Sequence, residues 1–402
     1  MIVMNFVFIS PNFPETYRWF CVRLKENGAN VLGIGDAPYS ELHPELRDAL
    51  TEYYRVHSME DYDEMVRAMG YFTFRYGKID WLESNNEYWL EQDAALRTAF
   101  NITTGPKLDK INSYKSKWAM KDLYRKAGVP TARCLQVTTL EAAEEFIEQV
   151  GYPVIVKPDN GVGANATYRL KNEDDLHHFF LCLPEVPYLM EEYVTGMVTT
   201  YDGIVNSKGE VLFAASHITP NSIMDMVNEG LPTFYYVDKA VPAEVEKAGK
   251  ATLKAFGVKS RFFHLEFFRL TEDKPGLGKK GEIAALEVNM RPAGGFTTEM
   301  LNFGQSVDVY QIWADMVCFD ERRHTYGGSP RYCVYAGRRD GVSYQLTLDE
   351  LQMLYPENAC LFTRMPDALS DAMGNQVAIC TFDTKAEVEK FIQTAFGTSR
   401  KK

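Results

Sequence analysis

Short apolar runs alternate with helix-like spacings from the start of the chain. Residues 5–9 and 31–35 are apolar runs, and residues 15–26 between them are spaced as an amphipathic helix. A strand, a helix and a strand in this order predict a parallel sheet with crossover helices. A further strand over 79–84 and a helix over 87–100 complete this first α/β unit.

The middle of the chain mixes helices with hairpins. The patterns predict a basic helix over 111–127, further helices over 139–149, 173–182, 243–256 and 306–319, single strands over 134–137, 153–157, 167–170 and 187–194, and hairpins over 200–218 and 261–290. The segment 219–238, which follows the first hairpin, matches neither period and is predicted to be irregular.

A new alternation begins near residue 326. It predicts strands over 331–337 and 376–382 and helices over 347–354 and 384–395. These shifts in pattern predict an α/β protein of three parts, which comprise residues 1–105, 106–325 and 326–402.

Composition excludes several classes of protein. The 402 residues are 46% apolar and carry a net charge of −12, which fits a globular chain and argues against binding to nucleic acid. Seven isolated cysteines without a CxxC pair predict reduced thiols. No apolar run approaches the roughly 18 residues of a membrane span. We therefore expect a cytoplasmic protein without a membrane partner.

Polar residues alternate along the second strand of the later hairpin. Glu287, Asn289 and Arg291 would share one face, and His264 and Glu266 form a similar row on the preceding strand. Two acids on paired apolar strands are costly to bury unless a cation neutralises them. Oxygen ligands of this kind suit magnesium, so we interpret the rows as a magnesium site. Solvated acids on an exposed sheet face are the alternative.

A lysine and two glycines mark a second stretch. Lys157 ends the apolar strand 153–157, and Gly161 and Gly163 follow in a loop rich in turn residues. Glycines at such a place allow backbone N–H groups to approach phosphate oxygens. The chain contains no GxxxxGK[ST] motif, and a surface turn after an edge strand explains this stretch equally well.

The order and spacing of these stretches along the chain are more specific than any one of them alone. Lys117 precedes a helix that ends in AGVP, and PVIVKP with its glycine loop, MEEYV, HLEF and LEVNMRPAGG follow. This series resembles the ATP-grasp superfamily, in the arrangement of biotin carboxylase and carbamoyl-phosphate synthetase, over about residues 1–320. The resemblance implies an ATP-grasp fold with an N-terminal parallel α/β domain, a lid subdomain over about residues 130–195 within the second part, and a small C-terminal α+β region.

The resemblance also implies a role for each matching residue. ATP phosphates would be held by Lys117 and Lys157, under a lid loop that contains Gly161 and Gly163. Lys115 and Lys121 are rivals to Lys117. Adenine would contact Glu191, the backbone of Glu192 and Val194, and the apolar side chains of Ile155, Met190, Phe268 and Leu286. The ligands of Mg²⁺, or of Mn²⁺ in its place, would be Glu266, Glu287 and Asn289. Catalytic residues would be Arg291 and Lys157.

The implied function is that of an ATP-dependent carboxylate–amine ligase. Mg-ATP would convert a small carboxylic acid into an acyl phosphate, and an amine would then displace the phosphate. The expected partners are small-molecule substrates, and the sequence does not decide whether the chain forms a homodimer. One alternative is a nucleotide-binding regulator or pseudo-enzyme with this fold. Another is a bicarbonate-using enzyme like carbamoyl-phosphate synthetase or a carboxylase, although the chain has no biotinyl-lysine AMKM motif.

The irregular segment 219–238 is the candidate for substrate recognition. Its polar and aromatic residues are Asn221, Asp225, Asn228, Glu229, Tyr235 and Tyr236. Long loops inside a domain are usually functional or mobile. We expect this segment to bind the amine or the acid together with Gly294, Gly295 and Phe296. A mobile surface loop is the equal alternative.

Overall fold

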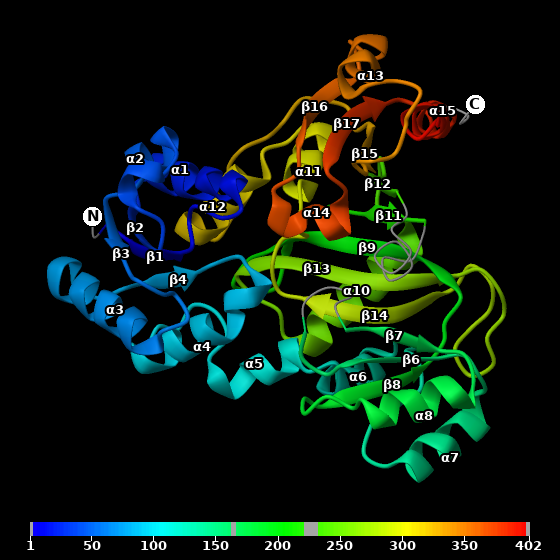
Figure 1. The fold of residues 1–402 in the computed structure, drawn as a ribbon. Helices are drawn as coiled ribbons and strands as arrows, with labels where there is room; N and C mark the ends of the chain where they lie inside the picture. The colour runs from blue at the N-terminus through cyan, green and yellow to red at the C-terminus, as the bar shows by residue number, and fades with distance from the viewer. Residues whose placement is uncertain (1–2, 162–165, 221–231, 399–402) are drawn as a thin grey trace.

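The described residues, 3–161, 166–220 and 232–398, form three β-sheets in this computed structural model (Figure 1). One sheet belongs to the N-terminal part, a large sheet runs through the middle of the molecule, and a small sheet lies beside the large one. Among the helices that the structure describes, each is too short or too polar to cross a lipid bilayer.

The N-terminal sheet confirms the prediction of parallel strands. Its order is β3-β2-β1-β4, and all pairs are parallel. The strands are β1 (Asn5–Ile9), β2 (Asn30–Gly35), β3 (Glu52–Arg55) and β4 (Trp81–Glu83), and the helices are α1 (Arg18–Glu26), α2 (Pro44–Ala49), α3 (Tyr62–Tyr76) and α4 (Leu90–Ala99). The sequence pattern had predicted β1, β2, β4, α1 and α4, but not β3, α2 and α3.

The predicted basic helix over 111–127 is wrong, because two helices occupy this stretch. They are α5 (Leu108–Lys115) and α6 (Lys117–Ala127), and Ser116 between them has an extended backbone. The Ser116 hydroxyl accepts a hydrogen bond from the Ala119 N–H and donates one to Asp159 Oδ2 at 2.8 Å. The break therefore makes Lys117 the first residue of α6 and ties it to the loop after Lys157.

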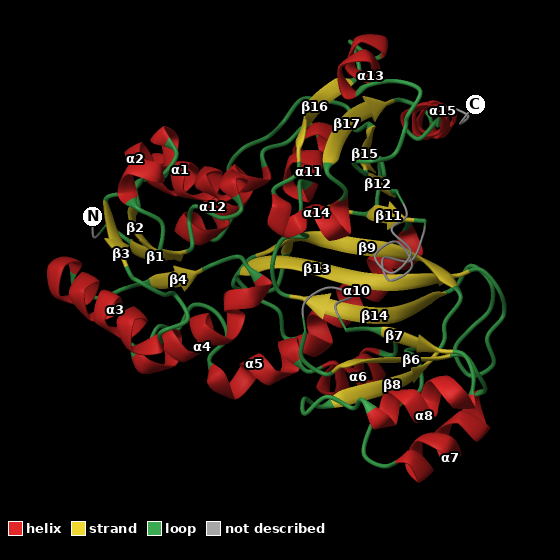
Figure 2. Cartoon of the chain, in the orientation of Figure 1, coloured by secondary structure: helices red, strands yellow, loops and turns green. Residues whose placement is uncertain are grey.

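The small sheet has the order β5-β8-β6-β7 and is antiparallel throughout. Its strands are β5 (Cys134–Gln136), β6 (Val154–Pro158), β7 (Tyr168–Leu170) and β8 (Tyr188–Glu192). Two helices, α7 (Leu140–Val150) and α8 (Glu173–Leu181), pack on one of its faces (Figure 2). The opposite face is left for the residues of the site.

The large sheet contains nine antiparallel strands within the described residues. Its main path is β14-β13-β9-β11-β12-β15-β17-β16, and β10 pairs with β9. The strands before residue 300 are β9 (Gly196–Val205), β10 (Val211–Ala215), β11 (His217–Thr219), β12 (Thr233–Val237), β13 (Arg261–Leu270) and β14 (Ile283–Asn289), and the later ones are β15 (Tyr332–Arg338), β16 (Ala359–Arg364) and β17 (Gln376–Phe382). The C-terminal strands thus continue the central sheet.

The segment 219–238 is not irregular throughout, so that prediction is wrong for its second half. Residues 233–237 form β12, which pairs with β11 on one side and with β15 on the other. Tyr235 and Tyr236 therefore lie in a strand. The other candidates of this segment, Asn221, Asp225, Asn228 and Glu229, lie outside the described residues.

The later helices cover the central sheet and connect it to the N-terminal part. They are α10 (Ala243–Phe256), α11 (Thr297–Gln305), α12 (Val309–Phe319), α13 (Leu348–Leu354), α14 (Asp367–Met373) and α15 (Lys385–Ala395). The buried Trp313 of α12 contacts the rings of Phe6 and Phe20, so α12 shares a core with β1 and α1. The three-part division of the chain stays a prediction.

Gly203 in the middle of β9 allows a close approach of strands. A Cβ atom at this position would lie 2.1 Å from the carbonyl oxygen of Phe213 and 2.7 Å from the Phe263 ring. We expect Gly203→Ala to lower the free energy of unfolding by roughly 1–3 kcal/mol, because the backbone of β10 cannot give way. Urea unfolding measures this loss.

A glycine in open space serves as the control. A Cβ atom at Gly70 in α3 has no neighbour within 4 Å, so Gly70→Ala should raise the free energy of unfolding by about 0.5–1 kcal/mol through helix propensity. If Gly203→Ala were as stable as the unchanged protein, the packing of β9 described here would be wrong.

Candidate functional site

One face of the central sheet carries a double row of polar side chains. Residues that lie opposite each other in antiparallel strands project to the same side. The strand register pairs Glu266 with Glu287 and Thr200, and pairs His264 with Asn289 and Asp202. We call this set the polar face; it comprises Glu287 and Asn289 of β14, Glu266 and His264 of β13, Thr200 and Asp202 of β9, and His217 of β11.

The two acids at one end of the polar face lie directly opposite each other. A Glu287 oxygen lies 3.0 Å from Lys117 Nζ, and a Glu266 oxygen lies 3.0 Å from His264 Nε2. Asn289 beside them is buried, and its Nδ2 has no hydrogen-bond partner among the described residues. Two carboxylates and one amide oxygen form the hard donor set that suits a magnesium ion.

Lysine side chains line the space between the polar face and the small sheet. Lys121 of α6 and Lys157 of β6 both contact the Glu191 carboxylate, with N–O distances of 2.5 and 2.7 Å. All three side chains are buried. Burial alone would raise the pKa of Glu191, but the two ammonium groups outweigh it and lower that pKa to about 2. Phosphate groups are the natural ligands of such an array of cations.

Lys117 differs from its two rivals in what it contacts. Its ammonium group lies beside Glu287 and donates to the Gly161 carbonyl at 3.4 Å. Lys121 contacts Glu191, and Lys115 forms a buried pair with Glu87 at 2.9 Å. Lys117 is thus the one of the three that joins the acid pair to the glycine loop.

The first residues of the loop after Lys157 are held by hydrogen bonds to the start of α6. Asp159 accepts hydrogen bonds from the Ser116 hydroxyl and from the Trp118 N–H, both at 2.8 Å, and so caps α6. Gly161 lies within reach of Lys117, whereas Gly163 lies outside the described residues. The predicted role of this loop as a lid therefore stays a prediction.

The residues predicted to bind adenine lie in and beside the small sheet. Ile155, Leu286 and Phe268 are partly exposed, whereas Met190 is fully buried in the core under α7 and α8. The Glu192 carboxylate pairs with the Arg133 guanidinium at 2.7 Å. The backbone N–H of Glu192 donates a hydrogen bond to the backbone carbonyl of Arg133. Val194 is buried against β13 and β14 neighbours.

Arg291 connects the site to the N-terminal part. Its Nε lies 3.3 Å from a Glu87 oxygen, and its Nη2 donates to Asn289 Oδ1 at 3.4 Å. Glu87 also holds Lys115, as described above. Glu83 of the N-terminal part is also buried, and its carboxylate contacts both Arg97 and Arg261, at 3.0 and 3.1 Å. These pairs orient the N-terminal part against the end of β14.

Sequence reasoning identified Glu287, Asn289, His264 and Glu266 but missed the three other members of the polar face, which are Thr200, Asp202 and His217. Asp202 lies between the two histidines, 2.6 Å from His264 Nδ1 and 2.8 Å from His217 Nδ1. Burial would lower the pKa of His264, but Asp202 and Glu266 outweigh it and raise that pKa to about 9. The alternation of Thr200 and Asp202 in an otherwise apolar strand was the signal that could have identified this row.

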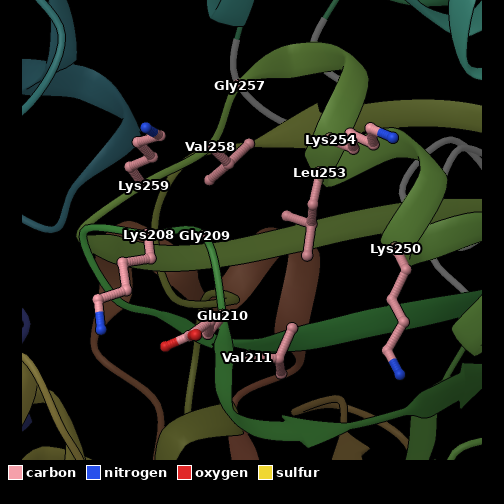
Figure 3. Close-up of a pocket in the computed structure, with 10 residues that line it drawn as sticks. All are labelled: Lys208, Gly209, Glu210, Val211, Lys250, Leu253, Lys254, Gly257, Val258 and Lys259. Atoms are coloured by element: carbon pink, nitrogen blue, oxygen red, sulfur yellow. The ribbon is translucent and has the colours of Figure 1, made fainter.

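A separate pocket of about 520 Å³ lies between the turn after β9 and the end of α10 (Figure 3). It is lined by Lys208, Lys250, Lys254 and Lys259. The figure shows their ammonium groups directed away from one another, so they do not converge on an anion. The residues of this pocket do not overlap with the predicted site.

Comparison with known proteins matches one part of the chain to a family. Residues 116–182 match the family "Carbamoyl-phosphate synthase L chain, ATP binding domain". The chain is also 24% identical over 318 residues to the L-arginine-specific L-amino acid ligase of Bacillus subtilis, and this match covers 77% of the chain and 74% of the ligase.

Solved structures share the fold over almost the whole chain. The L-amino acid ligase from Bacillus licheniformis superposes with a TM-score of 0.72 at 15% identity, and the match covers 98% of this chain and 97% of that one. The biotin carboxylase domain dimer of Hydrogenobacter thermophilus 2-oxoglutarate carboxylase, solved with MgADP, ADP and bicarbonate, has a TM-score of 0.69 at 14% identity and covers 98% and 89%. Both likenesses are to proteins with an ATP-grasp fold.

The pairing of Glu191 with two lysines predicts a pH dependence of stability. The folded-state pKa of about 2 lies below the ordinary value of 4.5, so the pairing adds stability above about pH 4.5 that is lost as the pH falls toward 2. Glu191→Gln should therefore lower the free energy of unfolding by about 3 kcal/mol at pH 7, and this deficit should shrink below pH 4.5.

Urea unfolding at pH 7 and pH 4 compares the two proteins. Glu148→Gln, an exposed change in α7, is the matched control and should leave stability near its original value at both pH values. A deficit of Glu191→Gln that was as large at pH 4 as at pH 7 would contradict the ion pairing.

Proposed function

Since the chain belongs to the ATP-grasp superfamily, we propose that it is an ATP-dependent carboxylate–amine ligase. It activates a small carboxylic acid as an acyl phosphate and transfers the acyl group to an amine, with release of ADP and phosphate. The observation that carries this proposal is the placement of the Glu266–Glu287 pair and Asn289 beside Lys117, Lys157 and Arg291. A nucleotide-binding regulator would not need this complete set.

The residues of the chain supply binding, orientation and charge. Lys117, Lys121 and Lys157 bind the phosphate oxygens of ATP, and Arg291 holds the phosphoryl group as it moves to the acid. Magnesium would be held by Glu266, Glu287 and Asn289 and would neutralise charge on the transferred group.

Amino acids are the first substrates to test. The likeness to the L-amino acid ligase of Bacillus subtilis supports an amino acid as the acid, the amine or both. A screen of the twenty L-amino acids in pairs, with ADP release as the readout, tests the proposal directly. Release of ADP that depends on both a carboxylate and an amine supports the ligase, and ADP release with bicarbonate alone favours the carboxylase-like alternative.

Glu287 should be essential for turnover. Glu287→Gln keeps the volume of the side chain but removes one charge from the acid pair, so we expect kcat to fall by roughly a hundredfold or more with little change in Tm. Turnover at several magnesium concentrations and thermal unfolding measure the two effects.

Glu282 offers a matched control on the same hairpin. It is exposed just before β14, and Glu282→Gln should keep normal turnover. If Glu287→Gln turned over normally, the proposed metal site would be excluded.

Lys157 should contribute to ATP binding in addition to its ion pair with Glu191. Lys157→Ala removes one of the two cations that hold Glu191 and the proposed phosphates, so the Kd for ATP should rise by roughly tenfold or more. Calorimetric titration with ATP measures this change. Unchanged ATP affinity would show that Lys157 serves only the ion pair with Glu191.

A further inference from the structure

Asp202 joins two histidines on the part of the polar face that lies farthest from the lysines. Its Oδ1 accepts a hydrogen bond from His264 Nδ1 at 2.6 Å, and its Oδ2 is 2.8 Å from His217 Nδ1. The Thr200 hydroxyl also donates to Oδ2 and accepts the N–H of His217 at 3.0 Å. All four side chains are buried, so each position in this network is closely determined.

The hydrogen bonds give the two histidines different surroundings. His264 lies between two carboxylates, Asp202 at Nδ1 and Glu266 at Nε2, so it donates through both nitrogens as an imidazolium. His217 uses only Nδ1 for Asp202, and the structure gives its Nε2 no partner among the described residues. Asp202 therefore occupies Nδ1 of His217, and Nε2 is the ring nitrogen that is left to meet another group.

The ring of His217 contacts the rings of two neighbours on the polar face and on β12. Its ring stacks on His264 with centroids 5.4 Å apart and faces Tyr235 at 5.6 Å. The Tyr235 hydroxyl is 3.1 Å from Thr297 Oγ1, which donates to the Gly294 carbonyl in the turn after Arg291. Contacts therefore lead from His217 through Tyr235 and Thr297 to the turn that follows Arg291.

The charged groups around the ring come from several elements. The carboxylates of Asp202 on β9 and Glu266 on β13 face the imidazolium of His264, and Arg291 follows β14. On the side of α11, Glu299 is partly buried and hydrogen-bonded to Thr298 and Tyr310. Tyr235 of β12 is neutral, because burial raises its pKa far above the usual value.

We propose that His217 is a catalytic residue that accepts the proton of the amine substrate. This inference rests on the proposed ligase function. The ammonium form of the amine gives one proton to His217 Nε2, and the nitrogen lone pair then attacks the acyl carbon. A C–N bond forms, the bond from that carbon to the phosphate oxygen breaks, and phosphate leaves with the electron pair and takes up the second proton of the nitrogen, so that a neutral amide remains. Asp202 stabilises the imidazolium that results.

Hydroxylamine separates this step from the formation of the acyl phosphate. It is unprotonated near neutral pH, so it captures an acyl phosphate without a base, whereas an amino acid arrives as an ammonium ion. His217→Asn keeps an N–H donor for Asp202 but has no Nε2. With the best amino acid pair from the screen, we expect this variant to lose roughly a hundredfold or more in amide formation. It should keep ADP release and hydroxamate formation with hydroxylamine near the original rates.

A second Asp–histidine pair supplies the control. His324 lies 2.9 Å from Asp315 outside the polar face, and His324→Asn should leave both rates unchanged. His217→Gln is the second variant if His217→Asn fails to fold, and it should show the same selective loss.

Three results would overturn the inference. Equal losses with the amino acid and with hydroxylamine would show a structural role for His217, and no loss with either would show no role. One equivalent of zinc bound to the purified protein and lost in His217→Asn would assign Asp202, His217 and His264 to a metal instead. If the unchanged protein forms no hydroxamate with any amino acid, the proposed ligase function itself fails.

Discussion

Every buried carboxylate of the site lies against a cation, and this need for neutral charge organises the structure around it. A carboxylate removed from water is stable only when a partner replaces its hydration. The pairs join distant parts of the chain: Glu83 with Arg97 and Arg261, Glu87 with Lys115 and Arg291, Glu191 with Lys121 and Lys157, Glu287 with Lys117, and Glu266 with His264. These ion pairs connect the N-terminal part, α6, the small sheet and the central sheet at one place.

Part of this arrangement follows from local sequence and part from register. The parallel N-terminal sheet is predicted by a strand, a helix and a strand within 35 residues, and the row of Glu287, Asn289 and Arg291 by alternation within one strand. The break at Ser116 interrupts a pattern that is apolar at helical spacing, so only the hydrogen bond to Asp159 reveals it. Asp202 and His217 come together because β9 pairs with both β13 and β11, and pairing between strands is not visible in either strand alone.

Two elements of the fold show the same limit. β12 is a short strand with aromatic residues, and its partner β15 lies in what the pattern treats as a separate region. α11 follows a turn of two glycines, so its helical spacing begins without a clear start signal. In both cases contacts with distant residues determine the structure, and the local sequence only permits it.

The dependence of early segments on late ones also bears on how the protein is made. Trp313 of α12 completes the core around Phe6 and Phe20, and β12 has β15, synthesised about one hundred residues later, as its partner. A nascent chain of which only the first 300 residues or so have left the ribosome therefore exposes an apolar helix face and an open strand edge. A nascent chain of this length is therefore the form that most needs protection by a chaperone.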